Sequence, residues 1–112
     1  MAHQFISIKE ACEAFCTSME AGRYYDAHED LEAIWFPRRH EDDTEVRLWK
    51  RFINGAVSCE LLMRGRVEPS HRVWETYRKY HTLLETIESD HYEIYVKMEQ
   101  LIQHRRNVCL LS

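Results

Sequence analysis

The sequence is poor in the residues that interrupt regular structure. Its 112 residues include only three glycines and two prolines, whereas hydrophobic residues make up 45% and charged residues 30%. This composition argues against a disordered or low-complexity chain, because such chains lack the apolar side chains needed to form a core. The length fits one domain, residues 1–112, that can bury a core without covalent crosslinks.

Long apolar runs are also absent from the sequence. No segment approaches the roughly 18 consecutive apolar residues of a membrane span, and the opening MAHQFISIKE lacks the basic and apolar regions of a secretion signal. We therefore expect a cytoplasmic protein without membrane contact. Cys12 and Cys16 share one helix face, Cys59 and Cys109 have no partner by spacing, and we interpret all four as reduced thiols.

Apolar periodicity without strand-like alternation predicts an all-α fold, a single-domain bundle of about five helices. The expected helices cover approximately residues 7–22, 24–36, 44–65, 69–87 and 90 to the C-terminus. Their boundaries carry start and stop signals. The start signals are Ser7 with Glu10, Thr44, Pro69 with Ser70, and Asp90 with Glu93, and the stop signals are Gly22, Pro37 and Gly65.

Two of these helices place ionisable residues within an apolar stripe. In GRYYDAHEDLEAIW, residues 22–35, His28 falls between Tyr24 and Trp35, with Glu32 one turn later. Glu60 takes a similar position on the third helix. Because a buried charge needs a partner, we expect His28, Glu32, Glu60 and a tyrosine hydroxyl to form one polar cluster.

The expected cluster has two interpretations. In the first, the protein is an uncharacterised structural or small-ligand-binding module without a cofactor, whose cluster fixes the helix register. In the second, His28 and Glu32 bind a divalent metal with Glu60 or His81 as third ligand, and Glu29 acts as catalytic base, as in His-Glu-x-x-His peptidases. Such a carboxylate-rich set favours iron, manganese or magnesium over structural zinc. Whether the chain is an enzyme stays open.

Charge and exposed apolar residues suggest possible partners. Residues 47–79 hold 8 basic and 3 acidic side chains, which is compatible with weak binding of a polyanion. Nucleic acid is not the favoured partner, because no recognition helix or RNA-binding signature accompanies this region. The apolar run of Trp35, Phe36 and Pro37 could extend to the surface and support a homodimer. The physiological partner is left open.

The segment GRYYDAHEDLEAIW resembles the small all-helical family called domain of unknown function 309. Members show a glycine, an aromatic pair, an acidic residue, Ala-His-Glu, then Leu-Glu and a tryptophan, in the order found at residues 22–35. The family's second landmark is matched by INGA, which contains Asn54 and Gly55. The resemblance implies an all-helical fold. Some related sequences are described as predicted metal-dependent hydrolases, which supports the metal interpretation by analogy.

Overall fold

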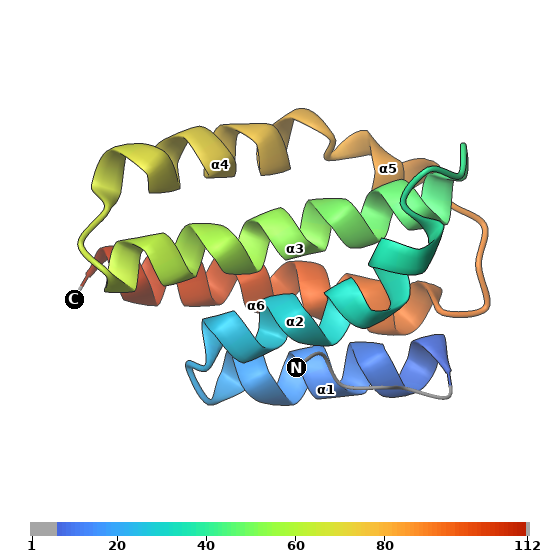
Figure 1. Cartoon of the computed structure of the whole chain (residues 1–112), viewed down its shortest axis with the longest axis horizontal. Helices are drawn as coiled ribbons and strands as arrows, with labels where there is room; N and C mark the ends of the chain where they lie inside the picture. Colours follow the sequence, from blue (N-terminus) through green and yellow to red (C-terminus); the bar gives the residue numbers. More distant parts are fainter. Residues whose placement is uncertain (1–6, 112) are drawn as a thin grey trace.

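A computed structural model describes residues 7–111 of the chain and confirms the all-α fold. Within these residues the chain forms five long α-helices, one short α-helix and a 3-10 turn, and Figure 1 shows how the α-helices are arranged. The elements are α1 (Ile8–Glu20), α2 (Tyr24–Trp35), η1 (Phe36–Arg38), α3 (Thr44–Met63), α4 (Val67–Lys79), α5 (Thr82–Thr86) and α6 (Tyr92–Leu110). Within the described range, no helix combines the length and apolar character required to cross a membrane.

Helix α3 is the centre of the bundle. It packs against α2 on one side and α4 on the other, and α6 lies against both α3 and α1 (Figure 1). The core between these helices is largely apolar, and its fully buried side chains include Phe15, Leu31, Trp49, Phe52 and Ile102. Burial of such side chains is the main favourable contribution to folding.

Gly55 allows the helices to approach each other closely at the middle of α3. A Cβ atom at this position would lie 2.7 Å from Cγ2 of Ile102 on α6 and 3.2 Å from Cε1 of Tyr77 on α4. Both distances are shorter than normal carbon contacts, so any larger residue would push one of the neighbouring helices away. The glycine of the INGA segment therefore sets how tightly α4 and α6 pack on α3.

Several local signals are confirmed. The Ser7 hydroxyl accepts a hydrogen bond from the backbone N–H of Glu10 at 3.1 Å, which caps α1. Gly22 has φ of +74°, the left-handed geometry that favours glycine after a helix. The last residue of α2 is Trp35, and Pro37 lies in the following 3-10 turn.

Other boundaries were predicted wrongly. Asp43 rather than Thr44 caps α3, because its carboxylate accepts from two N–H groups of the first turn. Asp90 does not cap α6. The N-cap residue is His91, which makes no side-chain capping hydrogen bond, and its backbone N–H donates to the Ser89 hydroxyl at 3.1 Å. Helix α4 begins at Val67, two residues before Pro69. The proline is tolerated there because the N–H groups of the first helical turn have no helical partner.

The expected fourth helix, residues 69–87, is divided into two. Helix α4 ends at Lys79, and the short helix α5 begins at Thr82. At the junction, Nδ1 of His81 lies 3.0 Å from the carbonyl oxygen of Arg78. This contact places the His81 side chain beside the C-terminal end of α4 rather than on a continuous stripe.

Candidate functional site

His28 is mostly buried, as the sequence predicts, and meets an acid of its own helix. Its side chain is 20% exposed, and Nε2 lies 3.2 Å from a carboxylate oxygen of Glu32. The ring of Tyr25 stands edge-on to the imidazole. Nδ1 is buried without a hydrogen-bond partner among the described residues. The intrahelical half of the expected cluster is therefore present.

The interhelical half of the cluster was predicted wrongly. Glu60 does not pair with His28; its carboxylate lies 2.9 Å from the guanidinium of Arg64, one turn further along α3. The Glu60 side chain does face inward, since it is only 15% exposed, but its partner is Arg64 rather than His28. Glu60 lines a shallow hollow of about 290 Å³ at the C-terminal end of α3, together with Tyr25 and Met63.

The residues expected to bind a metal do not fit that role. Among residues 7–111, no group of three or more His, Cys, Asp or Glu side chains could hold an ion. His28 and Glu32 provide two donors, but Glu60 is paired with Arg64 and His81 contacts the α4 backbone. Glu29 is partly exposed on α2. We therefore derive no metal-dependent step from this segment.

Tyr24 and Trp35 connect α2 to the rest of the bundle. The Tyr24 hydroxyl accepts a hydrogen bond of 3.0 Å from Nε of Arg105 on α6. Trp35 packs against the edge of the core, and Nζ of Lys50 on α3 lies 4.4 Å from its ring centroid. Both contacts are of the kind that holds neighbouring helices in register.

Comparison with known proteins identifies the part of the chain that forms α2, α3 and most of α1. The model of the family Domain of unknown function (DUF309) matches residues 12–73, which is more than half of the chain. The chain belongs to this family. No curated protein and no solved structure matched it. The region matched to DUF309 ends within α4, so α5 and α6 lie outside it.

A buried charged network that sequence reasoning missed joins α3, α4 and α6. The Arg51 side chain is only 2% exposed, and its guanidinium binds both carboxylate oxygens of Glu99, one of them at 3.0 Å. Its Nε donates to the carbonyl oxygen of Tyr77 at 2.9 Å. The Tyr77 hydroxyl donates to Glu99 at 2.6 Å and completes the network.

The network determines the charge of its members. Burial alone would raise the pKa of Glu99, but the hydrogen bonds from Arg51 and Tyr77 hold this pKa below its ordinary value. Burial raises the pKa of the Tyr77 hydroxyl, so this group stays protonated and donates. Glu99 is therefore a carboxylate at neutral pH, and its charge balances that of Arg51.

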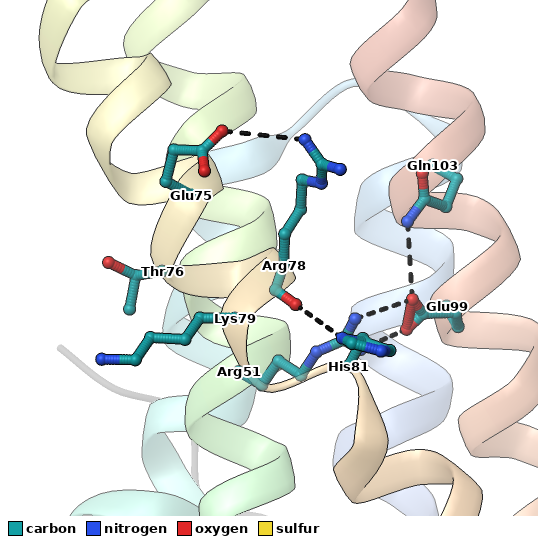
Figure 2. A pocket seen from close by; sticks show the side chains of 8 residues that line it. All are labelled: Arg51, Glu75, Thr76, Arg78, Lys79, His81, Glu99 and Gln103. Atoms are coloured by element: carbon teal, nitrogen blue, oxygen red, sulfur yellow. Dashed lines mark hydrogen bonds and ion pairs between the residues drawn. The ribbon is translucent and has the colours of Figure 1, made fainter.

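This network forms the floor of a groove between α4 and α6. The groove has a volume of about 670 Å³, and Figure 2 shows Arg51 reaching from α3 towards Glu99 on α6. Its lining is dominated by polar and charged side chains, which are Arg51, Glu75, Thr76, Arg78, Lys79, His81, Glu99 and Gln103. Two of these, Glu75 and Arg78, form an ion pair of 3.7 Å on the α4 side.

A second buried arginine, Arg106 on α6, has no carboxylate partner among the described residues. Its guanidinium donates to the Ser70 hydroxyl at 2.7 Å and lies 3.0 Å from Nδ1 of His71. It also stacks 4.8 Å from the ring of Trp74. All three partners come from α4 and are 32 or more residues distant in sequence, so no local pattern could have revealed this contact.

Proposed function

We propose that this protein is a non-enzymatic helical module that binds a small, negatively charged molecule in the groove between α4 and α6. The observation that carries this proposal is the charged groove itself, built over the buried pair of Arg51 and Glu99. Its volume of about 670 Å³ lies within the range of roughly 300 to 1,000 Å³ that is typical of small-molecule sites.

The charge balance of the groove favours an anion. Three of its lining side chains are permanently cationic and two are carboxylates, which leaves one excess positive charge. Arg51 is paired with Glu99, and Arg78 with Glu75. Lys79 has no carboxylate within ion-pair distance in the described chain, so its ammonium group is the cation available to a ligand. Gln103 and Thr76 add neutral hydrogen-bonding groups.

The floor of the groove supports binding because it is already ordered. Arg51 is fixed by Glu99, by the backbone of Tyr77, and by stacking of its guanidinium 3.9 Å from the Tyr77 ring. A side chain that is immobile before binding loses little conformational entropy when a ligand arrives. The groove therefore presents a fixed polar surface at its floor and the Lys79 ammonium at its α4 side.

Binding of an extended polyanion along residues 47–79 is less well supported. Five of the 8 basic residues in this region have a carboxylate within 4.0 Å, which reduces the positive charge available to phosphates. The five are Arg47, Arg51, Arg64, Arg72 and Arg78. A short anion that needs only the local charge at one groove is more consistent with this distribution.

The proposal can be tested by titrating the isotope-labelled protein with inorganic phosphate and with citrate at low salt. We expect amide chemical shifts to move in residues 75–81 and around Glu99 and Gln103, and Lys79→Gln to weaken the binding several-fold. The control Lys97→Gln removes a cation that lies on another face of α6 beside Glu20, and it should leave the affinity unchanged.

Two outcomes would contradict this function. One is the absence of saturable shifts in the groove with either anion at millimolar concentration. The other is an equal loss of affinity in Lys79→Gln and Lys97→Gln, which would indicate a response to the net charge of the whole protein rather than to a site.

A further inference from the structure

His81 is the histidine whose side chain lines the groove between α4 and α6. It follows the C-terminal end of α4, and its Nδ1 lies 3.0 Å from the carbonyl oxygen of Arg78 (Figure 2). A carbonyl oxygen can only accept a hydrogen bond, so Nδ1 of His81 carries a hydrogen and donates it. This contact decides which nitrogen of the ring remains available.

The other ring nitrogen, Nε2, is therefore the atom at which His81 gains or loses a proton. In the neutral ring Nε2 has a lone pair and no hydrogen, because Nδ1 already holds one. Within residues 7–111 Nε2 has no hydrogen-bond partner, and the side chain is exposed. Protonation turns Nε2 from an acceptor into a charged donor and leaves the bond from Nδ1 to Arg78 in place.

Among the residues that line the groove, only His81 is of a type that ordinarily changes charge between about pH 5 and 8. The other charged lining residues are the cations Arg51, Arg78 and Lys79 and the carboxylates Glu75 and Glu99. Burial acts to raise the pKa of Glu99, but the hydrogen bonds from Arg51 and Tyr77 hold it below its ordinary value, so Glu99 keeps its charge in mildly acidic solution. His81 therefore determines how the charge of the groove varies in this range.

The surroundings of His81 allow a second uncompensated cation when an anion is bound. Arg51 and Arg78 are each paired with a carboxylate, so the charge that opposes protonation of His81 is mainly that of Lys79. The C-terminal end of a helix carries partial negative charge, which favours a cation beside the last turn of α4. A bound dianion offsets the repulsion between the two cations. Proton uptake and anion binding therefore strengthen each other.

We propose that His81 makes anion binding in this groove sensitive to acid. Uptake of a proton at Nε2 supplies a second cation in addition to Lys79, and the groove then binds a dianionic group, such as sulfate or a phosphate monoester, more tightly. The affinity falls as the pH rises and the ring loses this proton. This inference rests on the function proposed above, because it assigns the regulation of the same groove.

The test is titration of the full-length protein with sulfate, which stays a dianion in neutral and mildly acidic solution. At low salt we expect sulfate to bind about two- to five-fold more tightly at about pH 5.5 than at about pH 8, the change typical of one exposed charge pair. His81→Gln should abolish this difference. The control His104→Gln removes an exposed histidine of α6 that does not line the groove, and it should keep the difference.

Nitrogen NMR of the isotope-labelled free protein tests the geometry of the ring without any anion. At alkaline pH, His81 should carry its hydrogen on Nδ1. His71 is an internal comparison, because its Nδ1 lies 3.0 Å from the guanidinium of Arg106, which can only donate. His71 should therefore carry its hydrogen on Nε2. A His81 ring with its hydrogen on Nε2 would overturn the proposal.

The outcomes of the sulfate titration have separate meanings. Saturable binding with the same affinity at both pH values would overturn the role of His81 and leave the anion site intact. A pH difference that survives in His81→Gln would also overturn it, because another group would then be responsible. Absence of saturable binding at either pH would contradict the proposed function itself, and this inference with it.

Discussion

Replacing Glu99 by glutamine removes the negative charge that balances Arg51 and changes little else. The amide has nearly the shape of the carboxylate, and its oxygen can still accept from the Tyr77 hydroxyl. The guanidinium of Arg51 stays cationic, is 2% exposed, and faces an NH₂ group that cannot accept its hydrogen bonds. We expect the folded state to be destabilised because a charge is left buried without its counterion.

The size of the effect follows from the burial of the two partners. Removing one member of a buried ion pair destabilises by about 3 to 5 kcal/mol. Because Glu99 is 22% exposed, water can approach the vacated carboxylate position, and Arg51 keeps its bond to the Tyr77 carbonyl. We therefore expect a destabilisation at the low end of this range, about 3 kcal/mol. This loss corresponds to a fall in Tm of roughly 12 °C for a domain of this size.

Urea unfolding followed by far-ultraviolet circular dichroism at neutral pH measures this difference. The control Glu93→Gln changes an exposed carboxylate on the same helix and should alter the free energy of unfolding by less than about 0.5 kcal/mol. In the double variant Arg51→Met with Glu99→Gln, no unpaired charge remains, so we expect a smaller loss than for Glu99→Gln alone. If Glu99→Gln unfolds within about 0.5 kcal/mol of the wild type, the pair does not stabilise the bundle as argued.

Two further predictions concern the same interface. Gly55→Ala should lower the free energy of unfolding by about 1 to 3 kcal/mol in urea titrations, because the new methyl group would lie 2.7 Å from Ile102; an unchanged midpoint would contradict the close packing of α6. Because the pKa of Glu99 is lowered in the folded state, its stabilising contribution is present above the unfolded pKa and is lost as the pH falls through the folded value. Thermal melts between neutral pH and about pH 3 should therefore lose stability more steeply for the wild type than for Glu99→Gln, and parallel profiles would contradict this assignment.

Features of the fold that depend on neighbours in the sequence could be predicted. The cap at Ser7 and the left-handed turn at Gly22 require only the residues within one helical turn, and the structure confirms both. The period of apolar residues likewise predicts helices without knowledge of their partners. The cap of α3 was misplaced by one residue because Asp43 and Thr44 can both cap a helix, and only the backbone geometry decides between them.

The direction of a side chain could be predicted more reliably than its partner. Helical phase places His28 towards the interior, and its side chain is in fact mostly buried. The same phase places Glu60 inside an apolar stripe, and its side chain is only 15% exposed. Phase contains no information on which charged group lies nearest, and Arg64, one turn further along α3, is the partner of Glu60.

The groove could not be predicted, because it depends on contacts between helices that are distant in sequence. Glu99 on α6 meets Arg51 on α3 across 48 residues. The match to DUF309 ends at residue 73, so Arg51 is the one lining residue inside the matched region, whereas the lining residues between 75 and 81 and those on α6 lie outside it. The family region therefore supplies part of the floor of the groove, and the segments that follow it supply the walls. Variation in those segments would change what the groove binds, while the motif around His28 stayed the same.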